Sequence, residues 1–598
     1  MFKSLKELFN LLEEDQRKKL YLLQLLVIFM SLLEVASVMA FGPFMALVGN
    51  LEQLEKEGFM ADLFTASGLE NSVDFLIVMA FIVLGLLIIS AAVSMYTLWV
   101  LSVYGEKVGA SLSSRLYQYY LSQNWLFHTT NNSSQLTNKI SIECKRITDS
   151  IINPFMQMNA KLVLVIVMAI SILIYNPIVA IVGTSIFSFS YFFIFRRMKP
   201  LYEKNAREIS GSHNFRFKLM GEGFGGIKDT LLLGRQVLFT DNFKNASKLL
   251  ARALGKNLAL SQVPKYAIEL IAFGMVIFMV LYLLVDSEGE LGTILSILAV
   301  FSLAGLKLLP AFQQIYFSAS AIRGNLAAFE NLKDDLYASE TNLTEIEKDL
   351  KQRISLKKEI TMKNISFSYP NSDRSALKDI SLKIPANQVI GIVGPSGSGK
   401  STLLDIFLGL ITPSAGKLLI DGKSLTSESL RKWQNNIGFV AQDIFLADTS
   451  IRENIAFGLP VESINNDDLK KATLMAHLDQ LLESLPNGLD TTAGERGVQL
   501  SGGQRQRIGI ARALYNDPEV LIFDEATSSL DGITERVIMD AIHDFSGSKT
   551  IIVVAHRLAT VKRCDGIYLM ELGNIIDFGP YNDLIKRNKR FKQMTELA

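Results

Sequence analysis

Long apolar stretches are confined to the first half of the chain, where six of them alternate with polar segments. Each is near or above the roughly 20 residues that a helix needs to cross a hydrocarbon core about 30 Å thick. Backbone N–H and C=O groups in lipid must be paired within the segment, which favours helices. The pattern therefore predicts six membrane spans, at about residues 20–48, 74–104, 158–176, 177–195, 264–285 and 291–315.

The segments around these spans also follow a helical pattern. Leu5, Leu8, Phe9 and Leu12 fall on one face, which predicts an amphipathic helix within residues 1–19 at the inner membrane surface. The polar loops 105–157 and 196–263 are compatible with helices that continue past the membrane. We expect these extensions to bend at about 125–134 and 221–234.

Charged residues at the ends of the spans indicate how the chain is oriented. Basic residues mark the cytosolic side of a membrane protein. They cluster before the first span and after the fourth, whereas the loops after the first and fifth spans are acidic. The pattern predicts that both termini are cytosolic.

Beyond about residue 330 no apolar stretch approaches spanning length. Residues 331–358 are rich in Lys, Glu and Asp and predict a solvated linker. From 359 to 598, apolar strands alternate with helices, a pattern typical of a largely parallel sheet. The predicted fold is an all-α membrane domain at 20–330 with long cytosolic extensions, followed by an α/β domain at 359–598.

Composition agrees with this division. Hydrophobic residues make up 49% of the 598 residues, and mean hydropathy is +0.26. The 60 basic and 59 acidic side chains leave a net charge of +1, which argues against a nucleic-acid partner. Cys144 and Cys564 are far apart in sequence and indicate two unpaired thiols rather than a disulfide or metal site.

The sequence GPSGSGKS at 394–401 follows an apolar strand and precedes an apolar helix, the context that a phosphate-binding P-loop requires. Its glycines let consecutive N–H groups point at a phosphate. Lys400 would reach the β- and γ-phosphates and Ser401 would bind Mg²⁺. The other residues predicted to hold ATP here are Gly394, Pro395, Ser396, Gly397, Ser398, Gly399 and Thr402.

A second strand, VLIFDE at 520–525, ends in two carboxylates. Asp524 is placed to hold Mg²⁺, and Glu525 to orient or deprotonate a water in line with the γ-phosphate. The LSGGQ sequence at 500–504 then begins another helix with small residues, which indicates a second phosphate-binding N-terminus. Its predicted ATP contacts are Ser501, Gly502, Gly503 and Gln504.

With these motifs the chain resembles the ATP-binding cassette (ABC) family, and the resemblance covers its whole length. Tyr369 matches the aromatic that stacks on adenine and Gln442 the Q-loop glutamine, which also touches the metal. Asp531 matches the D-loop and His556 the switch histidine. The sequence GERG at 494–497 matches a coupling segment of exporters.

The resemblance implies a half-size exporter of the lipid-flippase type, in a bacterial inner membrane. In this family the LSGGQ of one subunit covers the nucleotide on the P-loop of the other, so it also implies a domain-swapped homodimer that binds ATP and Mg²⁺. Closure of the dimer would pass through the bends near 125 and 225 and switch the cavity from inward-facing to outward-facing.

Ionisable residues within spans are costly and often face a cavity. Glu34, Glu269, Lys307 and Arg323 are the candidates for substrate contact. A structural role is the alternative, with Lys307 extending toward the interface and Glu34 hydrogen-bonded between helices.

Two segments resemble bacterial flippases of lipid-linked oligosaccharides: GGIKDTLLLGRQ at 225–236 and KLLPAFQQI at 307–315. The resemblance implies that the substrate is a lipid-linked oligosaccharide or another glycolipid, and that membrane lipid is a partner. Export of lipid A, peptides or drugs remains an alternative. An ATP-gated channel or channel regulator is an alternative of another class, which the complete catalytic motifs disfavour.

Overall fold

In the computed structural model, described residues are 2–49, 51–54, 59–175, 177–286, 291–341, 352–370, 372, 374–494, 497–525, 545, 547–555 and 557–596. The chain divides into two compact units. The first comprises Met1–Gln123 and His128–Thr344, and the second comprises Asn124–Phe127 and Glu345–Ala598.

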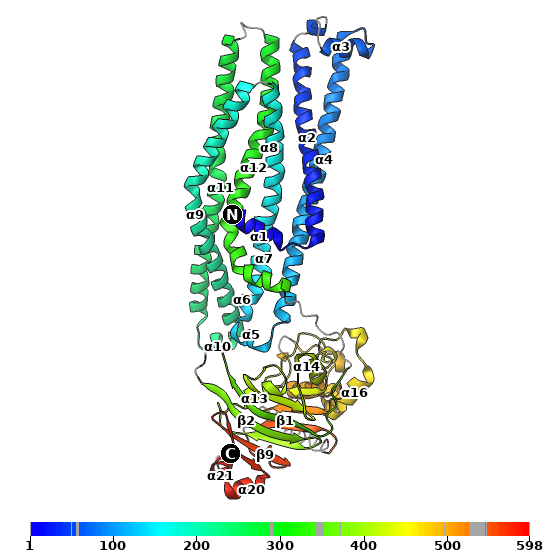
Figure 1. The fold of residues 1–598 in the computed structure, drawn as a ribbon, viewed down its shortest axis with the longest axis vertical. Coiled ribbons are helices and arrows are strands. Elements are labelled where there is room, and N and C mark those ends of the chain that lie inside the picture. The colour runs from blue at the N-terminus through cyan, green and yellow to red at the C-terminus, as the bar shows by residue number, and fades with distance from the viewer. Residues whose placement is uncertain are drawn as a thin grey trace. The chain divides into compact units, whose positions relative to one another are not determined.

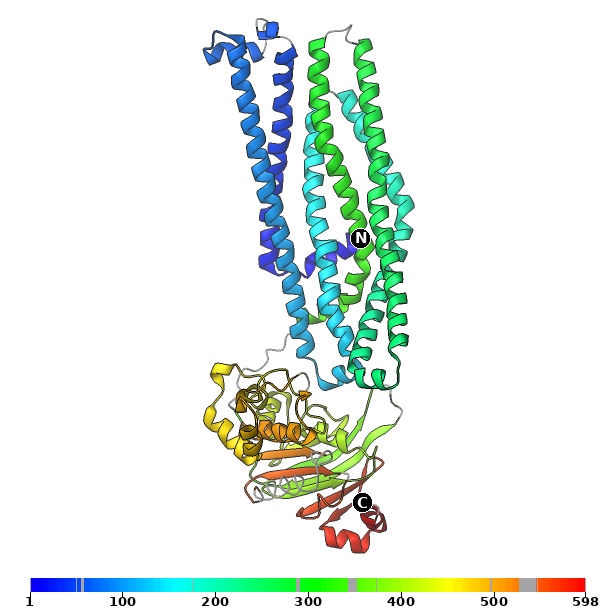
Figure 2. The ribbon, with the colours of Figure 1, turned by 180° about the vertical axis from the view of Figure 1, so that it is seen from behind.

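The first unit is helical. In Figures 1 and 2, α2 runs beside α4 and α9 runs beside α11. Its longer helices continue well beyond the length of the predicted spans. The helices of this part of the chain are α1 (Phe2–Asn10), α2 (Glu14–Gly49), α3 (Phe59–Ser67), α4 (Ser72–Leu121), α5 (Trp125–Thr130), α6 (Ser133–Asn138), α7 (Cys144–Ile147), α8 (Asn153–Tyr175), α9 (Pro177–Gly225), α10 (Ile227–Leu232), α11 (Gln236–Asp286) and α12 (Leu291–Thr341).

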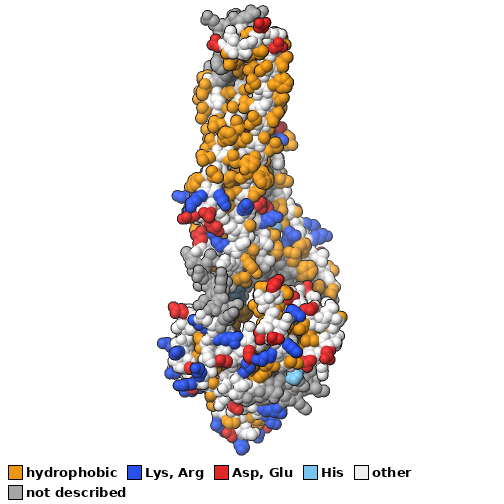
Figure 3. Space-filling view, turned by 90° about the vertical axis from the view of Figure 1, so that its right-hand side faces the viewer, with side chains coloured by type: hydrophobic (Ala, Val, Ile, Leu, Met, Phe, Trp, Pro, Cys, Tyr) orange, Lys and Arg blue, Asp and Glu red, His pale blue; other side chains and the backbone are white. Residues whose placement is uncertain are grey.

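The surface of this unit carries a broad hydrophobic band, with charged side chains at both of its ends (Figure 3). Among the described residues, four helical stretches are long and apolar enough to cross a membrane: Glu14–Gly49, Ser72–Leu121, Ser133–Ile174 and Gln236–Phe278. The other two predicted spans lie within α9 and α12, where many side chains are outside the described set.

Helix α1 covers the first part of the predicted amphipathic segment, and α2 begins at Glu14. The apolar face of α1 is buried by the protein itself, with Leu5 9% and Leu8 6% exposed. Glu7 pairs with Lys333 of α12 at 3.0 Å between Oε2 and Nζ. The predicted position of this helix at the membrane surface stays a prediction.

The prediction of a linker that begins at residue 331 is wrong for residues 331–341. Helix α12 continues to Thr341 because Phe329, Leu332 and Leu336, at helical spacing, are each at most 1% exposed. Residues 342–351 lie outside the described part of the chain. Beyond them, Leu356 is already fixed to the second unit, since its backbone N–H donates to Glu519 Oε2 at 2.7 Å.

Helix α7 lies between two π-helical segments, η2 (Lys139–Glu143) and η3 (Thr148–Ile152). Helix α4 approaches η3 and the first residue of α8 closely. A Cβ added to Gly109 would lie 2.0 Å from Thr148 Oγ1, and one added to Gly105 would lie 1.8 Å from Asn153 Oδ1. Two glycines four residues apart therefore allow this contact.

The described residues of the second unit form two sheets, with strand orders β2-β1-β4-β5 and β10-β9-β3-β8-β7-β6. The strands are β1 (Glu359–Ser368), β2 (Ser375–Pro385), β3 (Val389–Val393), β4 (Ala415–Ile420), β5 (Lys423–Ser424), β6 (Ile437–Val440), β7 (Val520–Asp524), β8 (Thr550–Ala555), β9 (Gly566–Glu571) and β10 (Asn574–Gly579). The helices are α13 (Lys400–Phe407), α14 (Ser427–Gln434), α15 (Ile451–Ile455), α16 (Asn466–Met475), α17 (Asp479–Ser484), α18 (Gly502–Leu514), α20 (Tyr581–Arg587) and α21 (Lys589–Glu596).

The six-stranded sheet forms the centre of this unit. Strands β9, β3, β8, β7 and β6 pair in parallel, and β10 joins antiparallel. Every residue of β3 and β8 is buried, as hydrophobic clusters cover both faces of the sheet. Parallel strands place their carboxyl ends at one edge, so the segments that follow β3, β7 and β8 begin near one another.

Candidate ATP-binding and catalytic site

The P-loop connects β3 to α13. Gly399 precedes the helix with φ +101°, a left-handed conformation that favours glycine. A Cβ on Gly394 would lie 2.3 Å from the Met570 carbonyl oxygen. The loop curls around Lys400, whose ammonium donates to the carbonyls of Gly394 at 2.8 Å and Pro395 at 3.1 Å. These contacts hold the cation inside the loop.

Lys400 lies in a charged environment. Burial lowers the pKa of its ammonium, while the carboxylates of Glu525 and Asp524 act in the opposite direction. Nearby, the Ser398 hydroxyl is buried with no hydrogen-bond partner among the described residues. A buried cation and an unsatisfied donor at a helix N-terminus fit the binding of a phosphate group.

The carboxylates at the end of β7 have distinct surroundings. Burial, and next the charge of Glu525, raise the pKa of Asp524 to about 6, and Lys400 opposes this shift. Gln442, which follows β6, donates from Nε2 to Glu525 Oε2 at 2.8 Å. The structure thus brings Lys400, Asp524, Glu525 and Gln442 into one site, as the sequence predicts.

The LSGGQ segment forms the N-terminus of α18. Ser501 is the N-cap, and its hydroxyl accepts from the Gln504 backbone N–H at 3.3 Å. The Gln504 side chain in turn accepts from the Ser501 N–H at 2.8 Å. This capping box fixes the first turn and leaves the start of the helix, with Gly502 and Gly503, at the surface.

Tyr369 lies beside the first turn of α13. Its hydroxyl is 3.1 Å from Thr402 Oγ1, and its ring meets that of Phe367 edge to face. An aromatic ring is therefore held next to the P-loop, where stacking on adenine is expected. Asp531, His556 and the two central residues of GERG lie outside the described residues.

The predicted Mg²⁺ ligands suit a metal held partly by phosphate. Among the described residues, no three His, Cys, Asp or Glu side chains form a metal-binding group. Mg²⁺ is commonly bound by one or two carboxylates together with substrate phosphates rather than by a protein cage. The Ser401 hydroxyl, the Asp524 carboxylate and the Gln442 amide supply oxygen donors of that kind.

The candidate substrate residues are not all brought together. Glu34 is 4% exposed, accepts from Ser94 Oγ at 2.6 Å and lies 3.8 Å from Lys307 Nζ. Glu269 instead pairs with Lys265 at 3.7 Å. Arg323 lies 16 residues beyond Lys307 on α12, about 24 Å along the helix axis.

Sequence reasoning missed the residues that complete these arrangements. Ser94 and Lys265 belong to no sequence motif. Their roles are visible only from their contacts in the structure, with Glu34 and Glu269 respectively. The spacing of Lys265 and Glu269, four residues apart on a helix, was the one available signal. The two thiols, Cys144 and Cys564, are free, as expected, and both are buried.

The fold and site define a membrane-spanning protein with a P-loop ATPase unit. Family models match at residues 57–305, the ABC transporter transmembrane region, and at 377–528, the ABC transporter domain. The ATP-dependent lipid A-core flippase of Photobacterium profundum is 30% identical over 542 residues, 89% of this chain and 90% of that protein. The chain belongs to the ABC transporter family and is an ATP hydrolase coupled to transport.

Other comparisons agree. The ATP-dependent lipid A-core flippase of Escherichia coli (strain K12) is 29% identical over 527 residues, 87% of this chain and 88% of that protein. The solved structure of a bacterial Atm1-family ABC exporter with ATP bound matches with a TM-score of 0.77 and 21% identity. It covers 96% of this chain and 97% of that one. This similarity confirms the predicted fold class.

Proposed function

We propose that this protein is an ATP-driven flippase that moves a glycolipid across a bacterial inner membrane, as a homodimer with its termini in the cytosol. The observation that supports this most is similarity to lipid A-core flippases over about nine tenths of both chains. A lipid-linked oligosaccharide is the finer proposal, supported by the segments at 225–236 and 307–315. Lipid A-core is the second candidate.

The site geometry supports a separate role for each of these residues in ATP hydrolysis. Lys400 binds the β- and γ-phosphates, and the N–H groups of the P-loop surround them. Glu525 orients the attacking water, and Gln442 positions Glu525 through its 2.8 Å hydrogen bond. Bound Mg²⁺ would neutralise charge on the phosphate oxygens, held by Ser401 and Asp524. His556 and Asp531 remain proposed contributors from the family resemblance.

Charge in the membrane helices supports an anionic, lipid-linked substrate. The Lys307 side chain is 43% exposed, while the side chain of its partner Glu34 is only 5% exposed. A separation of 3.8 Å is a loose ion pair, so Lys307 is able to exchange Glu34 for a phosphate. We propose that this pair lines the transport path. Glu269 and Arg323 are proposed as secondary contacts.

The proposed function is tested by the ATPase rate of the intact protein in lipid nanodiscs. Lipid-linked oligosaccharide is expected to stimulate hydrolysis severalfold, and lipid A-core is expected to do so if the second candidate is correct. An amphipathic peptide serves as the comparison. Stimulation by the peptide alone would remove the glycolipid proposal, whereas stimulation by lipid A-core alone would replace the finer one.

A further inference from the structure

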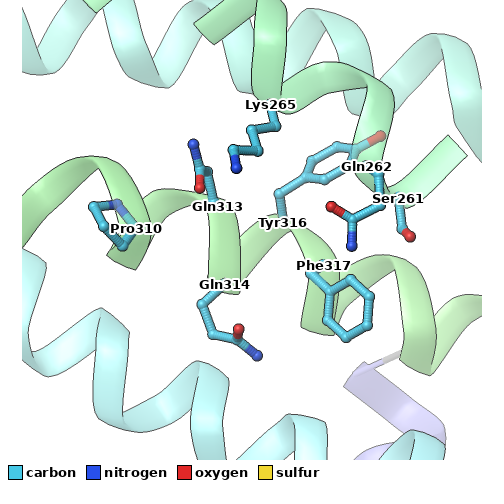
Figure 4. A pocket seen from close by; sticks show the side chains of 8 residues that line it. All are labelled: Ser261, Gln262, Lys265, Pro310, Gln313, Gln314, Tyr316 and Phe317. Carbon is cyan, nitrogen blue, oxygen red and sulfur yellow. The ribbon is translucent and has the colours of Figure 1, made fainter. Parts of the chain in front are cut away.

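A polar cavity of about 310 Å³ lies between α11 and α12 in the helical unit. Figure 4 shows side chains from both helices gathered around it, with Lys265 and Gln313 approaching from opposite sides. Pockets for small ligands are commonly about 300–1,000 Å³, so this volume suits a small part of a substrate. The side chains that matter are Ser261, Gln262, Lys265, Gln313, Tyr316 and Phe317.

Three of the eight lining residues, Gln262, Gln313 and Gln314, carry side-chain amides. Gln314, also in the wall, donates from Nε2 to Gln157 Oε1 of α8 at 2.7 Å, which fixes its orientation. Gln262 and Gln313 make no side-chain hydrogen bond to another described residue. Each carries two N–H donors and a carbonyl acceptor. The cavity therefore offers several hydrogen-bonding groups of both kinds to a ligand.

The charge in the wall of the cavity is balanced by an ion pair. Among the described residues of its wall, the one cation is Lys265, which Glu269 neutralises with 3.7 Å between Nζ and Oε1. This pair resembles that of Lys307 and Glu34, since the Lys265 side chain is 42% exposed and that of Lys307 is 43% exposed, so charge does not distinguish the two places. The lining distinguishes them, because amide groups and aromatic rings suit a neutral ligand rich in hydroxyl or amide groups.

Two aromatic rings complete the wall. The Tyr316 hydroxyl donates to the Leu260 carbonyl at 3.3 Å, which ties its ring to α11. Phe317 lies next to it on α12. Aromatic faces pack against the apolar faces of sugar rings while amides bond the hydroxyls at their edges. Rings and amides together are a combination suited to a carbohydrate.

The level of the cavity suits a head group that enters from the cytosolic leaflet. The predicted spans end at 264 on α11 and at 315 on α12, and the lining residues lie at these two ends. The sugars of a glycolipid stand at the membrane surface, where its acyl or prenyl chain remains in the hydrocarbon. A loading site for the sugar is expected at this level.

We propose that this amide-lined cavity binds a neutral sugar ring of the glycolipid, close to its lipid attachment, before it is flipped. The inference rests on the proposed function and adds a recognition site to it. Ser261, Gln262 and Gln313 bond the hydroxyl or acetamido groups, and Tyr316 and Phe317 pack on the ring. Lys265 and Glu269 keep the site neutral.

The test compares two probes in nanodiscs: polyprenyl pyrophosphate carrying one N-acetylglucosamine, and the same lipid without sugar. For the wild type, half-maximal stimulation of ATP hydrolysis is expected at a lower concentration of the glycosylated lipid than of the sugar-free lipid. In the double variant Gln262→Leu, Gln313→Leu, loss of the amides is expected to raise that concentration roughly tenfold for the glycosylated lipid. The response to the sugar-free lipid is expected to remain and shows that the variant folds.

Gln118→Leu is the matched control, because Gln118 is an exposed glutamine of α4 outside the cavity. It is expected to match the wild type with both probes. If the double variant keeps the full sugar-dependent difference, or if the wild type responds equally to both lipids, the sugar site is overturned while lipid flipping stands. A wild type that responds to neither lipid but to a peptide overturns both.

Discussion

At the scale of single residues, the backbone of Glu525 is unusual. Its φ is +48°, a left-handed conformation that non-glycine residues rarely adopt. The Glu525 N–H donates to the Val554 carbonyl at 3.0 Å, so the adjacent strand β8 fixes this turn. Strained residues of this kind are concentrated at active sites, where the surrounding structure stabilises them.

Replacing Glu525 with Gln tests its role in hydrolysis. The amide keeps the shape of the side chain but cannot accept the proton of the attacking water. We expect ATP hydrolysis to fall by about 10²–10⁴-fold with ATP binding retained, so that a closed dimer accumulates. Measurement of hydrolysis and of bound ATP checks this, and an unchanged rate would refute the role given to Glu525.

The raised pKa of Asp524 predicts how the enzyme depends on pH. The carboxylate takes up a proton as pH falls through about 6, and the protonated form is a poor Mg²⁺ ligand. We expect the Mg²⁺ concentration for half-maximal hydrolysis to rise severalfold between about pH 7.5 and 5.5. A Mg²⁺ titration at fixed ATP across this range measures the effect.

Asp405 provides the control for this pH dependence, since burial, and next the charge of Asp524, raise its pKa to about 6 as well. A carboxyl whose pKa is raised by folding stabilises the folded state fully below its unfolded pKa, and this stability is lost as pH rises through the folded pKa. Asp405→Asn is thus expected to raise the melting temperature above about pH 6 and leave the Mg²⁺ dependence in place. If Asp405→Asn loses the pH dependence of Mg²⁺ activation, that dependence would be assigned to Asp405 rather than to Asp524.

At the scale of elements, the contact of α4 with η3 and the start of α8 depends on the absence of two side chains. Gly109 faces Thr148, and Gly105 faces Asn153, at distances that leave no room for a Cβ. The neighbouring residues Tyr104, Val108 and Leu112 are buried on the same side of α4. The π-helical segments and this close approach together set how α4 packs on the helices around α7.

Gly109→Ala is expected to destabilise the helical unit by about 1–3 kcal/mol, because the added methyl group overlaps Thr148. Thermal unfolding of the protein in detergent measures the loss. Gly85→Ala on the same helix is the control, since nothing lies within 4 Å of the position of its Cβ. Equal melting temperatures for the two variants would contradict the proposed close contact.

At the scale of the whole molecule, the connection between α9 and α11 exposes apolar side chains at the end of α10 in the single chain. Leu231, Leu232 and Leu233 are 57%, 80% and 64% exposed. Exposed patches of this kind mark interaction sites. We interpret this end as a surface for the second subunit, in keeping with the predicted bend at 221–234.

Leu232→Asp is expected to reduce lipid-stimulated hydrolysis severalfold without lowering the melting temperature, because the side chain contributes little to the packing of its own chain. Leu474→Asp on α16, where the leucine is 54% exposed, is the matched control and is expected to behave as the wild type. Both rates are measured in nanodiscs. Normal stimulation in Leu232→Asp would show that this end is not needed for coupling.

The proposed homodimer, in which the P-loop of one chain faces the LSGGQ of the other, makes a prediction for mixed dimers. Lys400→Ala removes the P-loop cation and Ser501→Arg blocks the start of α18, so each homodimer is expected to lose nearly all activity. In the proposed arrangement, a dimer containing one chain of each kind keeps one intact site. Recovery of hydrolysis on coexpression supports the shared site, and no recovery contradicts it.

The sequence by itself determined the features that are local along the chain. A P-loop consists of a strand, a loop and a helix start, so residues 389–402 contain all that places Lys400 inside the loop. The LSGGQ cap is equally local, since Ser501 and Gln504 bond each other. Span length and composition likewise indicated the helices of the membrane unit, because the bilayer imposes both on the segment itself.

The tertiary structure alone decided the features that depend on which helices are neighbours. The partner of Glu34 is Lys307, 273 residues away, and no pattern near either residue indicates the pair. The cavity likewise arises only where α11 meets α12. The length of α12 beyond residue 331 follows from burial of its leucines by other helices. Contacts between distant segments depend on packing, which the periodicity of one segment does not encode.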